Sequence, residues 1–237
     1  MSNKELEKEF EARVYTDADG NTMPYRLLMP EKYDASKKYP LVLFLHGAAE
    51  RGDDNDSQLA NGVLNFATKR NRELYPCFVV APQCPANSAW VDIWNDILSE
   101  PMRMVFEILQ ALQKEFSIDQ RRRYITGISM GGFATWDTIE RMPGYFAAAV
   151  PVCGGGDTSS AYRIVHLPVW AFHGEDDQIV SVQYSRDMIA SIKKAGGNPK
   201  YTEYPGVGHA SWNYAYKDPE LYEWLFSQEK KTAEKKT

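Results

Sequence analysis

Residues 124–132 decide how this chain can fold; their sequence is YITGISMGG. The first of them form a short apolar run that is typical of a buried strand, and the run passes directly into a segment with helical character. Gly127, Ser129 and Gly131 satisfy the pattern G-x-S-x-G at the junction. A turn this tight strains the backbone of the central serine, and side chains at the two glycine positions would collide with neighbouring elements. The stretch therefore predicts a strand–turn–helix unit that lifts the Ser129 hydroxyl clear of a sheet.

Outward from this unit, short apolar runs alternate with helical segments. An antiparallel hairpin is expected at the start, where Val14-Tyr15 and residues 22–29 flank the turn DADG at 17–20. The other strands are expected at 41–45, 78–81, 124–126, 147–152, 169–172 and 201–204, and the helices at 57–69, 101–116, 130–141, 182–195 and 219–228. Strands with nearly continuous apolar residues are covered on both faces. The alternation therefore predicts an α/β fold, with a mostly parallel central sheet, helices on both faces and an N-terminal antiparallel hairpin.

Length and composition fit one α/β domain over residues 12–228. The chain has 237 residues, of which 43% are hydrophobic and 25% charged, and a domain of this size can bury a core without a disulfide or a metal. No repeat or linker divides it. Residues 229–237 are mostly charged, so we expect a disordered tail there.

Charge and hydropathy exclude several classes of partner. The net charge of −5 disfavours a nucleic-acid partner, and the cluster Arg121-Arg122-Arg123 precedes an apolar strand. No apolar run approaches the ~20 residues of a membrane span. Residues 1–10 are charged and do not resemble a signal peptide, which leaves the compartment open between cytoplasmic and secreted with the leader removed. The three cysteines lack metal spacing and are interpreted as buried thiols. The oligomeric state also stays open.

A serine hydroxyl becomes nucleophilic only when a base removes its proton, and the four histidines are the candidates for this base. His46 and His173 each end a predicted strand just before a glycine, where an imidazole usually braces a loop by hydrogen bonding. His166 lies in a loop between strands, which favours a surface or packing role. His209 follows the last predicted strand in the glycine-rich loop PGVGH, which can place an imidazole over the C-terminal edge of the sheet. His209 is therefore the predicted base of Ser129.

A carboxylate must orient such a base. The segment HGEDD at 173–177 ends a predicted strand and leaves Glu175, Asp176 and Asp177 open as candidates. An acid here lies between the serine and the histidine in the chain, which is the order of α/β-hydrolase triads. Backbone N–H groups must also bind the oxyanion: one is expected from Met130, directly after the serine, and the other from Ala48 or Ala49, with Ala48 preferred.

At this point a family resemblance is visible. It is carried by YPLVLFLHG at 39–47, ERGDDN at 50–55, APQCP at 81–85 with Trp90, the turn around Ser129, and residues 172–177 and 206–212. Together these segments resemble small bacterial α/β-hydrolase esterases. These are related to dienelactone hydrolases, polyhydroxybutyrate-depolymerase-like proteins, and feruloyl and acetyl-xylan esterases. The resemblance implies hydrolysis of carboxylic esters without a metal or cofactor, and its H-G-x-x-D usage favours Asp177. The chain departs from the pattern at Ala49, where glycine is expected, and at Ser181, where proline is usual.

The sequence says less about the substrate. Trp90 and Trp212 are predicted to line the pocket, Trp94 is a further candidate, and Trp136 is interpreted as a core residue. The expected partner is a small-molecule or polysaccharide-linked ester, with small or aryl esters preferred and feruloyl or acetyl groups as examples. Two alternatives stay open: a serine peptidase of the same fold, and a binding module without catalysis.

Overall fold

The computed structural model of this protein describes residues 2–92 and 97–230. Within them, eight strands form one sheet in the order β1-β2-β4-β3-β5-β6-β7-β8. The strands are β1 (Phe10–Thr16), β2 (Thr22–Leu28), β3 (Tyr39–Leu45), β4 (Phe78–Pro82), β5 (Ile118–Ile128), β6 (Ala148–Val152), β7 (Trp170–Gly174) and β8 (Lys200–Tyr204). The pairs β1–β2 and β2–β4 are antiparallel, and the pairs from β4 to β8 are parallel. The predicted fold class is confirmed.

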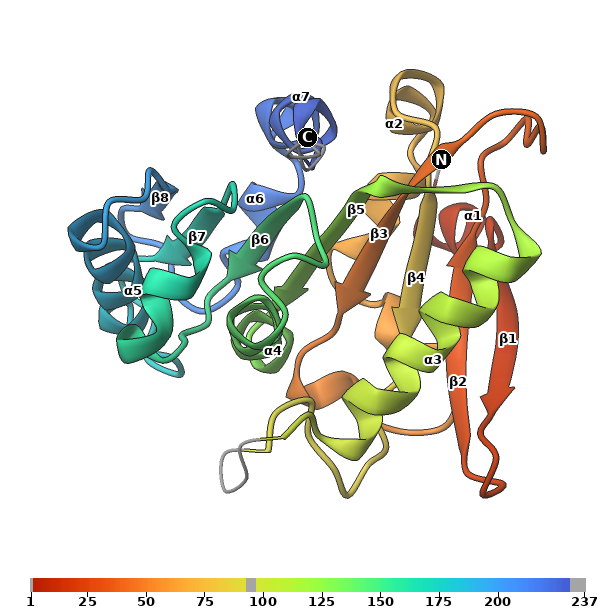
Figure 1. The fold of residues 1–237 in the computed structure, drawn as a ribbon, viewed down its shortest axis with the longest axis horizontal. Helices are drawn as coiled ribbons and strands as arrows, with labels where there is room; N and C mark the ends of the chain where they lie inside the picture. Colours follow the sequence, from red (N-terminus) through yellow and green to blue (C-terminus); the bar gives the residue numbers. More distant parts are fainter. Residues whose placement is uncertain (1, 93–96, 231–237) are drawn as a thin grey trace, which may run out of the picture.

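Helices cover both faces of this sheet (Figure 1). They are α1 (Asn3–Glu7), α2 (Lys69–Leu74), α3 (Glu100–Glu115), α4 (Met130–Arg141), α5 (Gln183–Lys194), α6 (Trp212–Ala215) and α7 (Pro219–Ser227). Apolar side chains of α3, α4 and α5 join one core cluster, and those of α1 and α7 join a second. Strand β3 shows how the sheet separates the clusters, since Leu41, Leu43 and Leu45 enter the first while Val42 and Phe44 enter the second. Successive side chains of a strand point to opposite faces, so β3 is buried along its whole length.

The predicted helix at 101–116 is confirmed within one residue at each end. Its N-cap is Ser99, whose hydroxyl accepts a hydrogen bond from the Met102 backbone N–H at 3.3 Å, and a proline stands in the first turn. Met104, Ile108 and Leu112 recur at helical spacing and are at most 3% exposed. Burial of this stripe fixes α3 on the sheet.

The predicted helix at 57–69 is wrong. Two short 3₁₀ turns, Ser57–Leu59 and Val63–Ala67, occupy this segment, and α2 begins only at Lys69. Gly62 interrupts the segment with φ of +84°, a left-handed conformation that does not continue an α-helix. A Cβ at this position would lie 2.5 Å from the ring of Tyr216, so the Tyr216 ring packs directly against the turn.

Three further predictions concern the cysteines, the tail and the membrane. Cys77, Cys84 and Cys153 are free and buried, as interpreted from the sequence. Most of the predicted tail, 231–237, lies outside the described residues, while Lys230 donates its backbone N–H to the Arg121 carbonyl at 3.0 Å. Among the described helices, none combines the length and the apolar character that crossing a membrane requires.

Glu140 on α4 is a buried acid with few partners. It is 5% exposed; its Oε2 accepts a hydrogen bond from the Asp157 N–H at 3.3 Å, and its Oε1 has no partner among the described residues. Burial raises the pKa of this carboxyl to about 8. The folded protein therefore binds a proton here that the unfolded chain releases near pH 4.5.

Because the folded-state pKa of Glu140 is raised, the stabilisation from its proton is complete below about pH 4.5 and is lost as the pH rises through about 8. Within this window the contribution changes by up to about 1.4 kcal/mol per pH unit. We expect Glu140→Gln to remove this loss, so that the variant gains on the wild type as pH rises. Urea unfolding at several pH values measures the difference, and the exposed Glu223→Gln is the control. Parallel curves for the wild type and Glu140→Gln would contradict the prediction.

Candidate active site

The turn between β5 and α4 holds Ser129 in a rare backbone conformation. Its φ is +51° and its ψ is −114°, in the left-handed half of backbone space that residues other than glycine rarely adopt. The Ser129 N–H donates to the Val152 carbonyl at 3.0 Å, and its own carbonyl accepts from the Phe133 N–H at 2.9 Å. A Cβ at Gly131 would lie 2.0 Å from the Leu45 carbonyl oxygen, so glycine is required for α4 to begin this close to β3. The strain is maintained by hydrogen bonds and close packing on both sides of the serine.

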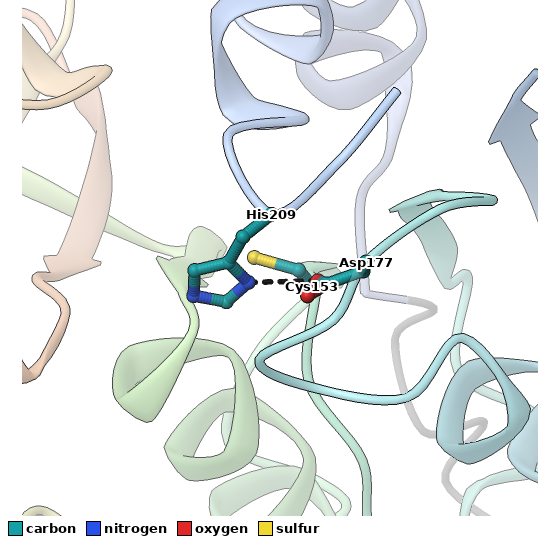
Figure 2. Close-up of side chains that lie close together, drawn as sticks. All are labelled: Cys153, Asp177 and His209. Atoms are coloured by element: carbon teal, nitrogen blue, oxygen red, sulfur yellow. Dashed lines mark hydrogen bonds and ion pairs between the residues drawn. The ribbon is translucent and has the colours of Figure 1, made fainter. Parts of the chain in front are cut away.

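The three side chains predicted to act together meet beyond the C-terminal ends of the strands. The Nε2 of His209 lies 2.9 Å from the Ser129 hydroxyl oxygen, and its Nδ1 lies 2.7 Å from Oδ2 of Asp177. Figure 2 shows the imidazole turned toward the Asp177 carboxylate. A carboxylate only accepts hydrogen bonds, so Nδ1 carries the proton and Nε2 is free to accept one from the serine. The neighbouring Asp176 is exposed and makes neither contact.

Backbone donors explain how a buried carboxylate stays charged at Asp177. Its Oδ1 accepts hydrogen bonds from the N–H groups of Ile179 and Val180, both at 2.9 Å, while its Oδ2 faces His209. Burial by itself would raise the pKa of this carboxyl, but the imidazole and the two amides together hold the pKa below its usual value. Asp177 therefore presents a negative charge to His209 at neutral pH.

The loops that carry the acid and the histidine are joined to each other. The Asp176 N–H donates to the Val207 carbonyl at 2.9 Å, and the Ser211 N–H donates to the His209 carbonyl at 2.8 Å. The Trp212 ring stands edge-on to the imidazole of His209, with centroids 5.3 Å apart at 84°. The loop after β8 thus places the imidazole through backbone bonds and ring packing.

The loop after β3 lies against the serine and carries the candidate oxyanion donors. A Cβ at Gly47 would be 3.6 Å from the Ser129 Cβ. His46 accepts the Cys84 N–H at its Nε2 at 2.9 Å, so its Nδ1 carries the proton and donates to the Gly47 carbonyl at 2.6 Å. Burial lowers the pKa of this imidazole to about 4, so it stays neutral. Since C=O and N–H point in opposite directions across a peptide, the Ala48 N–H points away from His46.

Two other backbone groups bear on the oxyanion prediction. Arg51 donates its Nε–H to the Ala48 carbonyl at 3.0 Å, which turns the Ala49 N–H away from the guanidinium. Met130 is the first residue of α4, and N–H groups of a first helical turn have no acceptor within the helix. The oxyanion donors Met130 and Ala48 stay a prediction, as does the choice between Ala48 and Ala49.

The two predicted substrate-binding tryptophans lie in different surroundings from each other. Trp90 is fully buried, donates its indole N–H to the His46 carbonyl at 3.1 Å and packs its ring on that imidazole. It braces the end of β3, so its assignment as a pocket-lining residue is corrected. Trp212 is partly buried against the core below α7, and the ring contact with His209 is its link to the site. Trp136 is a core residue, as interpreted, and Trp94 lies outside the described residues.

A cavity of about 700 Å³ opens beside Ser129. Its described walls are mostly apolar and come from the loop before α3, the start of α3 and the first turns of α4: Ser88, Ala89, Val91, Asp92, Ser99, Glu100, Pro101, Ser129, Met130 and Phe133. Phe133 was missed from the sequence, although its position one helical turn after Ser129 places it on the same side of α4. The cavity can hold a small or aryl group next to the serine hydroxyl.

Cys153 is a second residue that sequence reasoning missed. Its thiol, a carboxylate oxygen of Asp177 and a ring nitrogen of His209 lie within 4.8 Å of one another, and Figure 2 shows the sulfur beside the imidazole. Burial raises the pKa of the thiol to about 12, so it remains protonated, and the other two groups are hydrogen-bonded to each other. A protonated thiol is a poor metal ligand, so the cluster in this state is a packed hydrogen-bonded site. The signal in the sequence was the position of Cys153 directly after β6.

The sheet order and the placement of serine, aspartate and histidine after β5, β7 and β8 define an α/β-hydrolase. The chain belongs to the dienelactone hydrolase family, whose family model matches residues 83–237. Among solved structures, a thermostable esterase is 42% identical with a TM-score of 0.90, over 95% of this chain and 64% of that chain. The similarity to this esterase and the family match both support the assignment of the chain as a carboxylic-ester hydrolase.

Curated relatives carry esterase names. A bifunctional acetylxylan esterase/xylanase of Neocallimastix patriciarum is 26% identical over 155 residues, which are 65% of this chain and 22% of that protein. A probable feruloyl esterase C of Aspergillus terreus is 28% identical over 184 residues, 75% of this chain and 63% of that protein. The chain thus spans about a fifth of the first relative and just under two thirds of the second.

The close approach at Gly131 gives a test of the turn. We expect Gly131→Ala to destabilise the protein by roughly 3 kcal/mol or more, because the new methyl group would overlap a strand carbonyl that cannot move independently. Urea unfolding measures the loss. Gly144→Ala is the matched control, since a Cβ there meets nothing within 4 Å. Equal stability of the two variants would show that α4 can shift away from β3 at little cost.

Proposed function

We propose that this protein is a serine carboxylesterase that hydrolyses small or aryl carboxylic esters through an acyl-enzyme. The observation that carries the proposal is the unbroken hydrogen-bonded chain from Ser129 through His209 to Asp177, at 2.9 and 2.7 Å. Such a chain has the geometry of an activated nucleophile. A non-catalytic module would have no need to maintain the strained serine, so the chain of hydrogen bonds favours an enzyme.

Acylation begins when the Ser129 oxygen attacks the ester carbonyl carbon and its proton passes to Nε2 of His209. The carbonyl oxygen becomes an oxyanion that the N–H groups of Met130 and Ala48 stabilise. Asp177 stabilises the imidazolium without taking its proton. The tetrahedral intermediate then collapses, the bond to the alcohol oxygen breaks, and His209 delivers its proton to the leaving alcohol. An acyl group remains bonded to the Ser129 oxygen.

Deacylation repeats these steps with water. A water molecule gives a proton to Nε2 of His209 as its oxygen attacks the acyl carbon, and the same donors hold the second oxyanion. Collapse releases the carboxylic acid and returns the proton to the Ser129 oxygen. No cofactor or metal takes part in this sequence of steps.

The cavity beside the serine supports the proposed substrate class. Its apolar walls, including Met130 and Phe133, suit a short acyl or planar aryl group. The names of the relatives make feruloyl and acetyl esters of plant polysaccharide the first substrates to test. The net charge of −5 disfavours nucleic acid as a partner.

Ser129→Ala is expected to lower kcat by as much as ~10⁶ and leave the fold intact, because the serine oxygen forms the acyl bond. Turnover is measured with p-nitrophenyl acetate, methyl ferulate and acetylated xylan, with peptide anilides as the test for a peptidase. A fluorophosphonate probe should label the wild type and spare the variant. Wild-type cleavage of anilides alone would favour a peptidase, and a folded wild type that neither turns over nor reacts with the probe would favour a binding module.

Asp177→Asn is expected to lower kcat by ~10⁴, because an amide at this position favours the wrong imidazole tautomer. Asp176→Asn is the matched control, one residue away and exposed, and it should keep near-wild-type activity. Steady-state kinetics with p-nitrophenyl acetate compares the two. A large loss in Asp176→Asn together with a small one in Asp177→Asn would reassign the acid.

A further inference from the structure

A second histidine contacts the carboxylate that orients His209. His173 ends β7 with a fully buried side chain, and its Nε2 lies 3.2 Å from Oδ2 of Asp177 and 3.0 Å from the Val180 carbonyl oxygen. The same Oδ2 lies 2.7 Å from Nδ1 of His209. One carboxylate oxygen therefore faces two imidazoles, while the other oxygen accepts the two backbone amides.

The neighbours of His173 determine where its protons lie. The Val180 carbonyl and the Asp177 carboxylate only accept hydrogen bonds, so Nε2 carries a proton and is shared between them. Nδ1 lies 2.7 Å from the Ser185 hydroxyl oxygen. Burial lowers the pKa of this imidazole, so it is neutral, and its Nδ1 accepts the Ser185 proton, which is shared with the Gly154 carbonyl oxygen 3.1 Å from the Ser185 oxygen. His173 is thus a neutral donor with one tautomer.

We propose that His173 is a positioning residue of the site: its Nε2–H holds Oδ2 of Asp177 in place and takes up part of the negative charge that this oxygen presents to His209. The inference rests on the proposed function. A carboxylate oxygen that accepts two hydrogen bonds binds each donor less strongly than an oxygen that accepts one. His173 therefore limits how strongly Asp177 stabilises the imidazolium of His209, which keeps the base able to give its proton back.

Charged groups around His173 are few. Asp177 lies on the loop that follows it, His209 lies beyond that carboxylate, and Glu203 is its register partner on β8. Glu203 is bound by Arg186 of α5 at 2.5 Å, so this acid already has a cationic partner. The carboxylate of Asp177 is thus the acid that accepts the His173 proton.

Two amide substitutions separate positioning from packing. In His173→Gln the side-chain NH₂ can reach the place of Nε2 and still donate to Asp177. In His173→Asn the shorter amide reaches the place of Nδ1, toward Ser185, and the donor to Asp177 is lost. We expect His173→Gln to retain most of kcat. We expect His173→Asn to lower kcat about ten-fold or more with KM little changed, which is well short of the ~10⁴ for loss of the orienting acid itself.

The pH profile is the readout that a structural role would not move. Without the His173 donor, Asp177 stabilises the imidazolium more, so the acidic limb of kcat/KM should shift to higher pH in His173→Asn and stay in place in His173→Gln. NMR titration of the His209 ring protons should show the same difference between the variants. The titration midpoint should move to higher pH in His173→Asn and stay in place in His173→Gln. Ile189→Ala, a buried truncation on α5, is the control for destabilisation alone and should leave the limb unmoved.

These outcomes distinguish the inference from the function on which it rests. A wild type without turnover would overturn the proposed function, and the NMR titration would still test the contact between His173 and Asp177. An active wild type whose Asn and Gln variants lose stability equally, with neither limb nor titration shifted, would overturn the inference alone. Retained activity and an unshifted limb in Gln, against a slower enzyme with a shifted limb in Asn, would support it.

Discussion

The left-handed backbone of Ser129 is the constraint on which the rest of the site depends. A residue other than glycine at φ of +51° costs of the order of 1–3 kcal/mol, and it persists because its neighbours leave no alternative. The serine N–H is bonded to β6, its carbonyl begins α4, and Gly131 packs α4 onto a carbonyl of β3. Relaxing the turn would break contacts with two strands and a helix at once. The contacts with β6, α4 and β3 at the centre of the sheet therefore maintain the strained backbone of Ser129.

The buried charge of Asp177 imposes a second constraint. A carboxylate away from water is costly unless its oxygens find donors, and here backbone amides and imidazoles supply them. Those donors come from the acid loop itself, from the end of β7 and from the loop after β8. Because the acid requires all of them, the loops that carry Asp177 and His209 must close on each other. This requirement explains the backbone bond from Asp176 to Val207.

Much of this arrangement could be predicted from the sequence, because parallel strands end at one edge of the sheet and the residues that follow them meet there. Strand ends locate Ser129, His209 and the HGEDD segment without knowledge of any side-chain contact. Side-chain orientation was harder to predict. Trp90 looked like a pocket wall because nothing in the sequence shows that its indole N–H binds the His46 carbonyl. The helix predicted at 57–69 failed at Gly62, whose left-handed turn packs against Tyr216, 154 positions later in the chain. The position of Cys153 next to the site was missed for the same reason, since packing between β6 and the loop after β8 brings its thiol there.

Burial separates the histidines of this edge into two roles. His46 and His173 each end a strand, each precede a glycine, and each are at most 1% exposed. In both, the two ring nitrogens have hydrogen-bond partners within the fold, and burial lowers the pKa, which disfavours the imidazolium that a base must form. His46 orients the peptide of the proposed oxyanion donor, and His173 contacts the acid. His209, with a side chain 20% exposed, has one nitrogen that faces only the serine hydroxyl and the open site. A base must alternate between accepting and releasing a proton, and of the three imidazoles at this edge His209 alone has a nitrogen placed to do so.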